Sequence, residues 1–461
     1  MPTRSLVVAA AVCAAAAAAH AQTPPSSSPA GGALLSVPYT QFTLPNGLHA
    51  ILHRDDTVPV VSVNVWYHVG SANERPGRTG FAHLFEHLMF EGSRHVPEGA
   101  FDTLLEGAGG SNNGSTNTDR TNYFTDVPSN ALELALYLES DRMAYLLDAM
   151  SPARVDGQRD VVKNERRQSY ENRPYGMASI VLDELLFPET HPYHWPTIGY
   201  TDDLSAASYQ DVVEFFRRYY APNNASLVVA GDIDLAATRR LVEKWFGEVP
   251  RGEPIEPLAP PAAALTGVTQ RTLTDRVQLP RLFLAWITPP LLAPGDAELD
   301  VAAAVLSGGK NSRLYRRLVY DLQIAQSVSA RQQSGRLASA FVIDVVPRPG
   351  RTIEEIRRIV DEEIETLKAA PPDRREVDRA LNQIETSFYS RMERVGGFAG
   401  KADQLNAYYA ATGNPDYFAE DLARYRSLTP SDIQAIARRF LPADRRVELI
   451  VVPEGTGKGQ Q

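Results

Sequence analysis

The chain has 461 residues, of which 43% are hydrophobic and 22% are charged, a composition typical of a globular protein with more than one domain. Its net charge of -10 and its lack of a basic patch argue against a nucleic-acid partner. Cys13 is the only cysteine and lies in the first apolar segment, so a disulfide or a cysteine nucleophile is not expected in the mature chain.

The first 21 residues have the features of a cleavable secretory signal peptide. Arg4 precedes an Ala-rich apolar run that ends in the small-residue sequence Ala19-His20-Ala21. The run is short for a membrane-spanning helix, so we favour its removal before Gln22 and expect no stable membrane anchor. Residues 22–37 are predicted to be a flexible leader. The mature protein is therefore expected in the periplasm or outside the cell.

Regular structure is predicted from residue 39 onward. A hairpin with Asn46 and Gly47 at its turn is expected in FTLPNGLHAILHRD, and VVSVNVWYHVGS at 60–71 alternates like a half-buried strand. A Gly/Pro/Arg-rich loop then leads into the helix FAHLFEHLMF. The remaining predicted elements of this half are a helix from about 98 to the glycines at 107–110, one polar strand in NNGSTNTDRTNYFTDVP, helices at 130–150 and 154–170, and a buried strand at 226–233.

A Pro-rich linker at 251–267 separates this half from a second one of similar pattern. The second half begins with the strand RLFLAWITP and the helix ELDVAAAVLSG, and residues 431–453 repeat the helix, Pro and strand order of residues 209–231. Two charged helices, at 352–369 and 373–393, are expected to have solvated faces. We therefore predict an α+β protein with two homologous halves. The predicted bounds are 1–21 (signal peptide), 22–37 (leader), 38–250 (N-terminal domain), 251–267 (linker), 268–455 (C-terminal domain) and 456–461 (tail).

The stretch HLFEH is the first candidate for chemistry. His83 and His87 are four residues apart, so on a helix they lie on one face and can bind one metal ion, with Glu86 beside them. By spacing alone, such a pair fits a metal site and two ordinary helix histidines equally well. A catalytic zinc has three protein ligands and one open position. Glu165 and Glu171, both in VVKNERRQSYENRPYG, are the candidates for the third ligand, and spacing does not choose between them.

A family resemblance goes further. HLFEH fits the inverted zinc motif His-x-x-Glu-His, and together with VVKNERR downstream it resembles the pitrilysin-like metallopeptidases, which include insulin-degrading enzyme and the mitochondrial processing peptidases. Four further stretches resemble motifs of that family in the same order: NNGSTNTDRTNYF, YENRPYG, HPYHWPTIG and NNASLVVAGD. The resemblance covers essentially residues 38 to 453.

The resemblance implies a zinc-dependent endopeptidase with one Zn²⁺ per chain, bound by His83, His87 and Glu165, the last lying 78 residues after His87. Glu86 is then the general base that acts on a zinc-bound water, and Asn113, in an edge strand, contacts the backbone of the substrate. The implied fold is a clam-shell chamber between two halves, each a mixed, mostly antiparallel sheet covered by helices. The C-terminal half is expected to be an inactive homologous domain.

The chain departs from the family pattern at two places. Many members carry a second glutamate seven residues before the third ligand, where this chain has Gln158, an amide without charge. Single-chain members also carry an Arg and a Tyr in the C-terminal half, and the matching positions here are Val319 and Gln326. In some members the zinc motif and the Arg/Tyr pair belong to different subunits. We therefore predict a heteromer in which a paralogous subunit supplies the Arg/Tyr pair.

Two other functions compete with the peptidase. A non-catalytic assembly or chaperone-like subunit of the same fold is disfavoured because His83, Glu86, His87 and Glu165 are all intact. A metal storage or transport module fits poorly, because three ligands with a neighbouring base describe an open catalytic site. Outside the motif, His191 and His194 are expected to be structural. The carboxylates that we expect to be plain surface charges are Glu91, Glu98 and Glu171.

Overall fold

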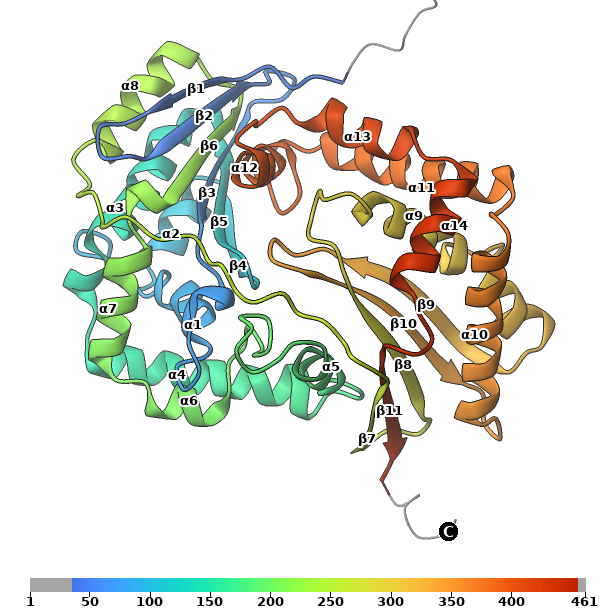
Figure 1. The fold of residues 1–461 in the computed structure, drawn as a ribbon. Helices are drawn as coiled ribbons and strands as arrows, with labels where there is room; N and C mark the ends of the chain where they lie inside the picture. The colour runs from blue at the N-terminus through green and yellow to red at the C-terminus, as the bar shows by residue number, and fades with distance from the viewer. Residues whose placement is uncertain (1–34, 455–461) are drawn as a thin grey trace, which may run out of the picture. The chain divides into compact units, whose positions relative to one another are not determined.

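The computed structural model describes residues 35–454. Within this part of the chain, no helix is both long and apolar enough to cross a membrane. The predicted signal peptide with Cys13, most of the leader and the tail lie outside the described residues. Residues 36–454 belong to one compact unit that contains two β-sheets (Figure 1).

The first sheet has six strands in the order β1-β2-β6-β3-β5-β4. Only β2 and β6 are parallel, and the other neighbours are antiparallel. Apolar side chains from this sheet and from its own helices form one core, which includes Val63, Phe85 and Leu136. The elements are β1 (Thr40–Thr43), β2 (His49–Arg54), β3 (Val60–Tyr67), α1 (Phe81–Leu88), α2 (Ala100–Gly107), β4 (Ser111–Thr116), β5 (Thr121–Pro128), α3 (Leu132–Ala149), α4 (Pro152–Arg166), α5 (Ala178–Leu186), α6 (Thr201–Ala206), α7 (Tyr209–Tyr219), β6 (Ala225–Gly231) and α8 (Leu235–Phe246).

The second sheet has five strands in the order β7-β11-β8-β10-β9. Again one pair, β7 with β11, is parallel and the rest are antiparallel, so the second sheet repeats the first without a counterpart of β1. The prediction of two homologous halves, each a mixed, mostly antiparallel sheet covered by helices, is confirmed. The elements are β7 (Thr269–Asp275), β8 (Arg281–Thr288), α9 (Asp296–Ser307), β9 (Ala325–Gln333), β10 (Ser339–Pro347), α10 (Ile353–Ala369), α11 (Arg374–Met392), α12 (Lys401–Thr412), α13 (Phe418–Arg426), α14 (Pro430–Phe440) and β11 (Val447–Pro453).

Local sequence explains how the repeated units begin and end. The helices α7 and α14 both start with a capping box, Ser208 with Asp211 and Thr429 with Asp432, in which each side chain bonds the backbone of the other. Each helix is followed by a proline and a buried strand, as predicted. One prediction was wrong: NNGSTNTDRTNYFTDVP forms two strands, β4 and β5, because Asn117 accepts bonds from the backbone of Asp119 and Arg120 and so turns the chain.

Each sheet is covered on one face by a helix that the other half supplies (Figure 1). Helix α5, from the N-terminal half, packs on β8 and β11, where Leu182 and Leu186 meet Phe283 and Leu449. Helix α12, from the C-terminal half, packs on β3 and β6. Residues 395–412, which contain α12, follow the linker by more than a hundred positions, so this cover is far from its sheet in the sequence.

The contact between α12 and the first sheet is polar and buried. Asp403 accepts hydrogen bonds from Trp66 Nε1 and Asn122 Nδ2, both at 2.8 Å. Asn406 donates to the backbone oxygen of Asn64 at 3.0 Å and accepts from Ser226 at 2.7 Å. These polar side chains point away from the apolar core of their own half, and α12 of the other half provides their hydrogen-bond partners.

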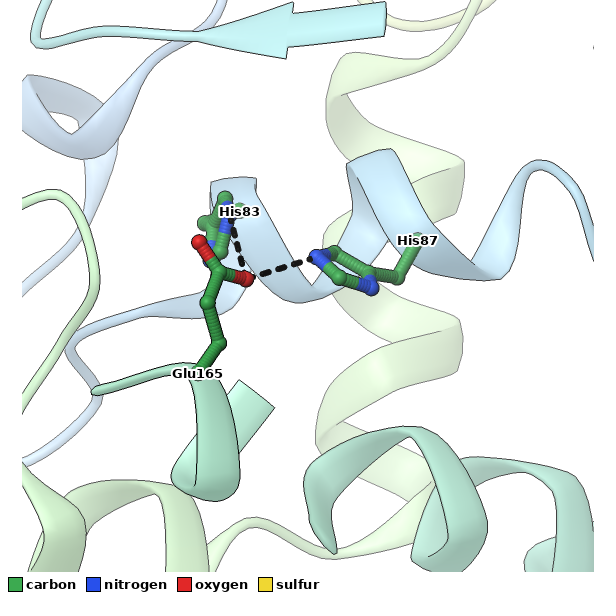
Figure 2. Close-up of side chains that lie close together, drawn as sticks. All are labelled: His83, His87 and Glu165. Carbon is green, nitrogen blue, oxygen red and sulfur yellow. Dashed lines mark ion pairs between the residues drawn. The ribbon is translucent and has the colours of Figure 1, made fainter. Parts of the chain in front are cut away.

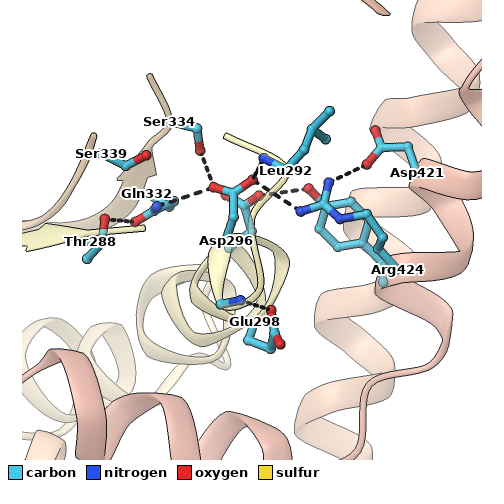
Figure 3. A network of polar contacts seen from close by, with 12 residues as sticks. Thr288, Leu292, Asp296, Glu298, Gln332, Ser334, Ser339, Asp421 and Arg424 are labelled. Atoms are coloured by element: carbon cyan, nitrogen blue, oxygen red, sulfur yellow. Dashed lines mark hydrogen bonds and ion pairs between the residues drawn. The ribbon is translucent and has the colours of Figure 1, made fainter. Parts of the chain in front are cut away.

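A second polar network lies at the start of α9 in the C-terminal half (Figure 3). Asp296 is 1% exposed, and its carboxylate accepts from Leu292 N at 2.9 Å, Ser334 Oγ at 2.6 Å and Arg424 at 3.2 Å. Arg424 also donates to Asp421 at 2.7 Å. The buried carboxylate of Asp296 at the start of α9 therefore links this helix to the end of β9, through Ser334, and to α13, through Arg424.

Asp300, one turn further along α9, gives a stability prediction. Burial raises the pKa of its carboxyl to about 7, although Tyr425 donates to it at 2.8 Å. The folded state therefore binds the proton more tightly than the unfolded chain, and ionising Asp300 destabilises the fold increasingly as pH rises from about 4 to about 7. We expect Asp300→Asn to raise the free energy of unfolding by about 2 kcal/mol at pH 8 and to leave it unchanged at pH 4. Thermal unfolding at the two pH values measures this, and an equal gain at both would contradict it.

Candidate active site

The helix that carries HLFEH begins at a buried cap. Gly80 precedes α1 with φ +86, a left-handed conformation, and a Cβ there would lie 2.9 Å from the backbone of Gly199. The carboxylate of Glu74 accepts from the backbone of Gly80 at 2.9 Å and of Ala82 at 2.8 Å. Burial raises the pKa of Glu74 despite these bonds. The cap fixes where α1 begins, and therefore where His83 and His87 lie.

Three of the predicted site residues come together in space (Figure 2). Oε2 of Glu165, near the end of α4, lies 3.6 Å from Nε2 of His83 and 3.3 Å from Nε2 of His87. Among the described residues, these are the only three His, Cys, Asp or Glu side chains grouped closely enough to hold a metal, with their ligand atoms within 4.8 Å of one another.

The three donors fit a zinc ion. Zinc bonds of about 2.0–2.2 Å in a tetrahedral site place neighbouring ligand atoms about 3.3–3.6 Å apart. Both Glu165 distances, 3.3 and 3.6 Å, fall in this range. Two imidazoles and one carboxylate are also a donor set that catalytic zinc uses, and three ligands leave the fourth position open.

The structure separates the two candidates for the third ligand. Glu171 lies at the end of a π-helical turn, Arg167–Glu171, and its carboxylate binds Arg166 Nε at 3.1 Å. Arg166, which is almost fully buried, also donates to the carbonyl of Gly199 at 2.6 Å. Arg166 thus fixes the end of α4 that carries Glu165 and pairs with Glu171, which is exposed at the surface, as predicted.

Glu86 lies beside the group of His83, His87 and Glu165, against the hairpin that β4 and β5 form. A Cβ on Gly114 of β4 would lie 3.2 Å from Cγ of Glu86, so the glycine gives this side chain its room. Burial raises the pKa of Glu86, while a hydrogen bond with Thr116 and the charges of His87 and Arg120 oppose the rise. A carboxyl with a raised pKa is suited to taking and releasing a proton near neutral pH.

The two histidines have different electrostatic environments. Burial lowers the pKa of His83 to about 4, against the opposite effect of Glu165. Burial also acts to lower the pKa of His87, but its hydrogen bond with Glu165, the charge of Glu86 and a hydrogen bond with Gln158 outweigh it and raise the pKa. The hydrogen bond with His87 in turn lowers the pKa of Glu165. At neutral pH, His83 therefore presents a lone pair without losing a proton, as metal binding requires.

Gln158 lies on α4, seven residues before Glu165. Its Nε2 donates to Oε1 of Glu91 at 2.6 Å. The prediction that Glu91 is a plain surface charge was therefore wrong, because the chain continues as a turn beyond α1 and brings Glu91 back to α4. Glu98, by contrast, is largely exposed and pairs loosely with Arg154 at 3.4 Å.

Asn113 lies in β4, an edge strand of the first sheet, next to the strand position that faces Glu86. Its side chain is exposed, and its Oδ1 accepts from the backbone of Gly114 at 2.8 Å. Among the described residues, no strand lies beside the outer edge of β4, so its backbone groups can pair with an added strand.

Residues 312–328, the segment that matches the family's Arg/Tyr motif, do not form one continuous helix. Tyr315–Asp321 is π-helical and β9 begins at residue 325, so Val319 packs against the C-terminal core while Gln326 is exposed on an edge strand. The nearby arginines have other partners: Arg313 binds Glu376, and Arg317 binds Glu362 and Glu363. The described residues of this segment therefore show no Arg/Tyr pair in the family's register.

Sequence reasoning missed several residues around the cluster. Glu74 and Arg120 lie in loops, and Arg120 donates to the backbone and hydroxyl oxygens of Ser115 at 2.7 Å. Glu91 follows His87 by four residues, a spacing that would have indicated a shared helix face had the helix been expected to continue. His191 stacks on Phe187 and accepts from the backbone of Tyr193, in keeping with its expected structural role.

Comparisons with known proteins agree with this architecture. Residues 49–186 match the family model "Insulinase (Peptidase family M16)" and residues 206–384 match "Peptidase M16 inactive domain". The chain is 27% identical over 421 residues to "Zinc protease PqqE" of Helicobacter pylori, covering 89% of this chain and 92% of that one. It is 24% identical over 437 residues to "Mitochondrial-processing peptidase subunit beta" of Blastocladiella emersonii, covering 91% and 90%. The crystal structure of a protease from Helicobacter pylori superposes with a TM-score of 0.84 at 26% identity, covering 91% of this chain and all of that one.

Proposed function

Because the chain belongs to the insulinase family of peptidases, family M16, we propose that it is a zinc-dependent endopeptidase in which His83, His87 and Glu165 hold one Zn²⁺ and Glu86 is the general base. The observation that carries the proposal is the convergence of Glu165 on both histidines at zinc-compatible distances, with Glu86 beside them.

When bound, the metal would polarise the scissile carbonyl and make water a better nucleophile at neutral pH. The residues of the chain do the rest. Glu86 takes a proton from the attacking water and passes it to the leaving amine, a transfer that its raised pKa favours. The substrate adds as a strand along β4, where Asn113 contacts its backbone and holds it in a chamber between the two halves.

The enzyme is proposed to act with a paralogous subunit. The C-terminal half offers Val319 in its core and Gln326 on an edge strand at the positions where the family's Arg and Tyr would lie. A second subunit that carries this pair would complete the site. The processing peptidase relative of Blastocladiella emersonii is itself named as a subunit. The sequence of residues 1–21 supports export, so the proposed location is the periplasm or the exterior.

The test is zinc content and peptide hydrolysis of the purified chain, with and without a co-expressed paralogue that lacks HxxEH. We expect one zinc per chain and hydrolysis that a chelator abolishes and zinc restores. We also expect at least tenfold faster turnover with the paralogue, because the arginine of its Arg/Tyr pair would stabilise the developing oxyanion. Full activity of the chain alone would contradict the need for a partner. A chain that binds zinc but never hydrolyses peptides in either sample would favour the non-catalytic assembly subunit.

A further inference from the structure

Two arginines share one buried carboxylate on the face of the second sheet that α5 covers. Asp344 of β10 accepts from Arg281 Nε at 2.9 Å and from Arg331 Nη1 at 2.6 Å. Val342, two residues earlier and on the same face of the strand, belongs to the apolar cluster that this sheet forms with α5. One guanidinium is enough to neutralise one carboxylate, so two arginines on Asp344 leave one positive charge in excess.

The excess charge has donors that face solvent. The side chain of Asp344 is 3% exposed, whereas those of Arg281 and Arg331 are 28% and 39% exposed. Among the described residues, Nη1 of Arg281 and the Nε and Nη2 atoms of Arg331 have no hydrogen-bond partner. A guanidinium binds a carboxylate through neighbouring N–H groups of this kind, so the two arginines can hold a second anion besides Asp344.

These arginines line a cavity of about 220 Å³ between α5 and the second sheet. Ser179 and Gln333 add uncharged polar groups to its wall. Asp183 is the one carboxyl among the described residues that line the cavity, and burial raises its pKa to about 7. At neutral pH much of Asp183 is therefore protonated, and its repulsion of an anion is weaker than that of a fully ionised carboxylate.

A second cavity, of about 290 Å³, adjoins the first on the side of the proposed zinc site. Tyr175, Ser179 and Arg281 line both cavities. The second cavity is also lined by Ser169 and Tyr170, which follow Glu165 by four and five residues where α4 continues into the π-helical turn. One helical turn, about 5 Å along the axis, thus separates this lining from a proposed zinc ligand. The arginines lie where a peptide that is bound at the metal can extend.

We propose that Arg281 and Arg331 form a subsite for a carboxylate of the peptide substrate, so that the enzyme selects peptides with an acidic group near the cleaved bond. The subsite rests on the proposed peptidase function and deepens it. The carboxylate has two possible sources, an acidic side chain or the C-terminus of a short peptide. An amide of the same shape cannot offset the excess positive charge. The C-terminal half, although it lacks the family's Arg/Tyr pair, would then contribute to the choice of substrate.

The test compares fluorogenic peptides that differ in one carboxylate, with the paralogue present. One series moves a Glu, or a Gln in the paired peptide, through the positions on either side of the cleaved bond. A second series compares a free C-terminal carboxylate with its amide. We expect kcat/KM to be about tenfold higher for the acidic peptide in one of the two series, which identifies the source of the carboxylate.

Arg331→Gln removes the excess charge and should reduce this preference to about twofold or less. Arg281 still binds Asp344 in the variant, so the buried carboxylate keeps a partner. Arg331→Lys keeps the charge without the planar fork and should retain an intermediate preference. The matched control is Arg374→Gln, at an exposed arginine of α11 that binds Asp378 at 2.8 Å, and it should retain the full tenfold preference.

Binding of the same peptides to the Glu86→Gln chain, measured by fluorescence anisotropy, gives the preference without hydrolysis. Equal values for the acidic and amide peptides in both series would overturn the subsite. A preference that Arg331→Gln leaves intact would overturn it as well. Absence of hydrolysis in every wild-type sample would instead overturn the proposed function, and the ratio of the two binding affinities would still decide whether the arginines select a carboxylate.

Discussion

Replacing Glu86 by Gln is expected to lower peptide hydrolysis by about a thousandfold while the chain keeps its zinc. The amide has the same size and can remain beside Gly114, but it cannot accept a proton from the attacking water. The three proposed ligands are untouched, because Glu86 is not one of the groups that converge on the metal position. Activity and zinc content should therefore separate in this variant.

The measurement is steady-state hydrolysis of a peptide with the paralogue present, together with zinc analysis of the same sample. Glu106→Gln, at an exposed position of α2, is the matched control and should leave both quantities unchanged. Loss of zinc in proportion to activity would place Glu86 among the ligands. Retention of more than a tenth of the activity would remove its role as the general base.

Replacing Asp403 by Ala is expected to destabilise the chain by about 3 kcal/mol. The carboxylate accepts from Trp66, from Asn122 and from the backbone of Ala399, and the first two of these donors are buried in the first sheet. Alanine would leave them without acceptors, in a place that water does not reach. The cost should thus exceed that of deleting an exposed carboxylate, which is typically below about 1 kcal/mol.

Urea unfolding followed by circular dichroism measures this effect, with Asp102→Ala on the exposed face of α2 as the control. We expect Asp403→Asn to recover part of the loss, because its amide oxygen can still accept from Trp66. A loss of less than about 1 kcal/mol in Asp403→Ala would show that the polar contact of α12 with the first sheet does not contribute to stability.

Much of the architecture follows from the sequence because it depends on local patterns. The hairpin at Asn46 and Gly47, the helix that carries HLFEH, and the repeated order of helix, proline and strand are all formed by residues close together in the chain. The convergence of His83, His87 and Glu165 could be predicted only from the family resemblance. Spacing along the sequence left Glu171 equally possible as the third ligand. The metal-binding and catalytic roles of these residues stay predictions until zinc and activity are measured.

What the sequence could not provide comes from contacts between distant segments. The strand β3 alternates Val with Ser62, Asn64 and Trp66, a pattern of a half-buried strand, yet its polar side is fully buried. Trp66 and Asn64 bind Asp403 and Asn406 of α12, and no local pattern in β3 predicts this contact. Glu91 was misjudged for the same reason, because its partner Gln158 lies 67 residues away in the sequence.

The exchange of covering helices also separates each sheet from its cover in the order of synthesis. The first sheet is complete when residue 231 has been made, but the helix that covers its polar face ends only at residue 412 of 461. A growing chain therefore holds Asn64, Asn122 and Trp66 on an uncovered surface until nine-tenths of its length has been translated. The apolar core of this half needs no residue of the other half, so what arrives late in synthesis is the cover of its polar face.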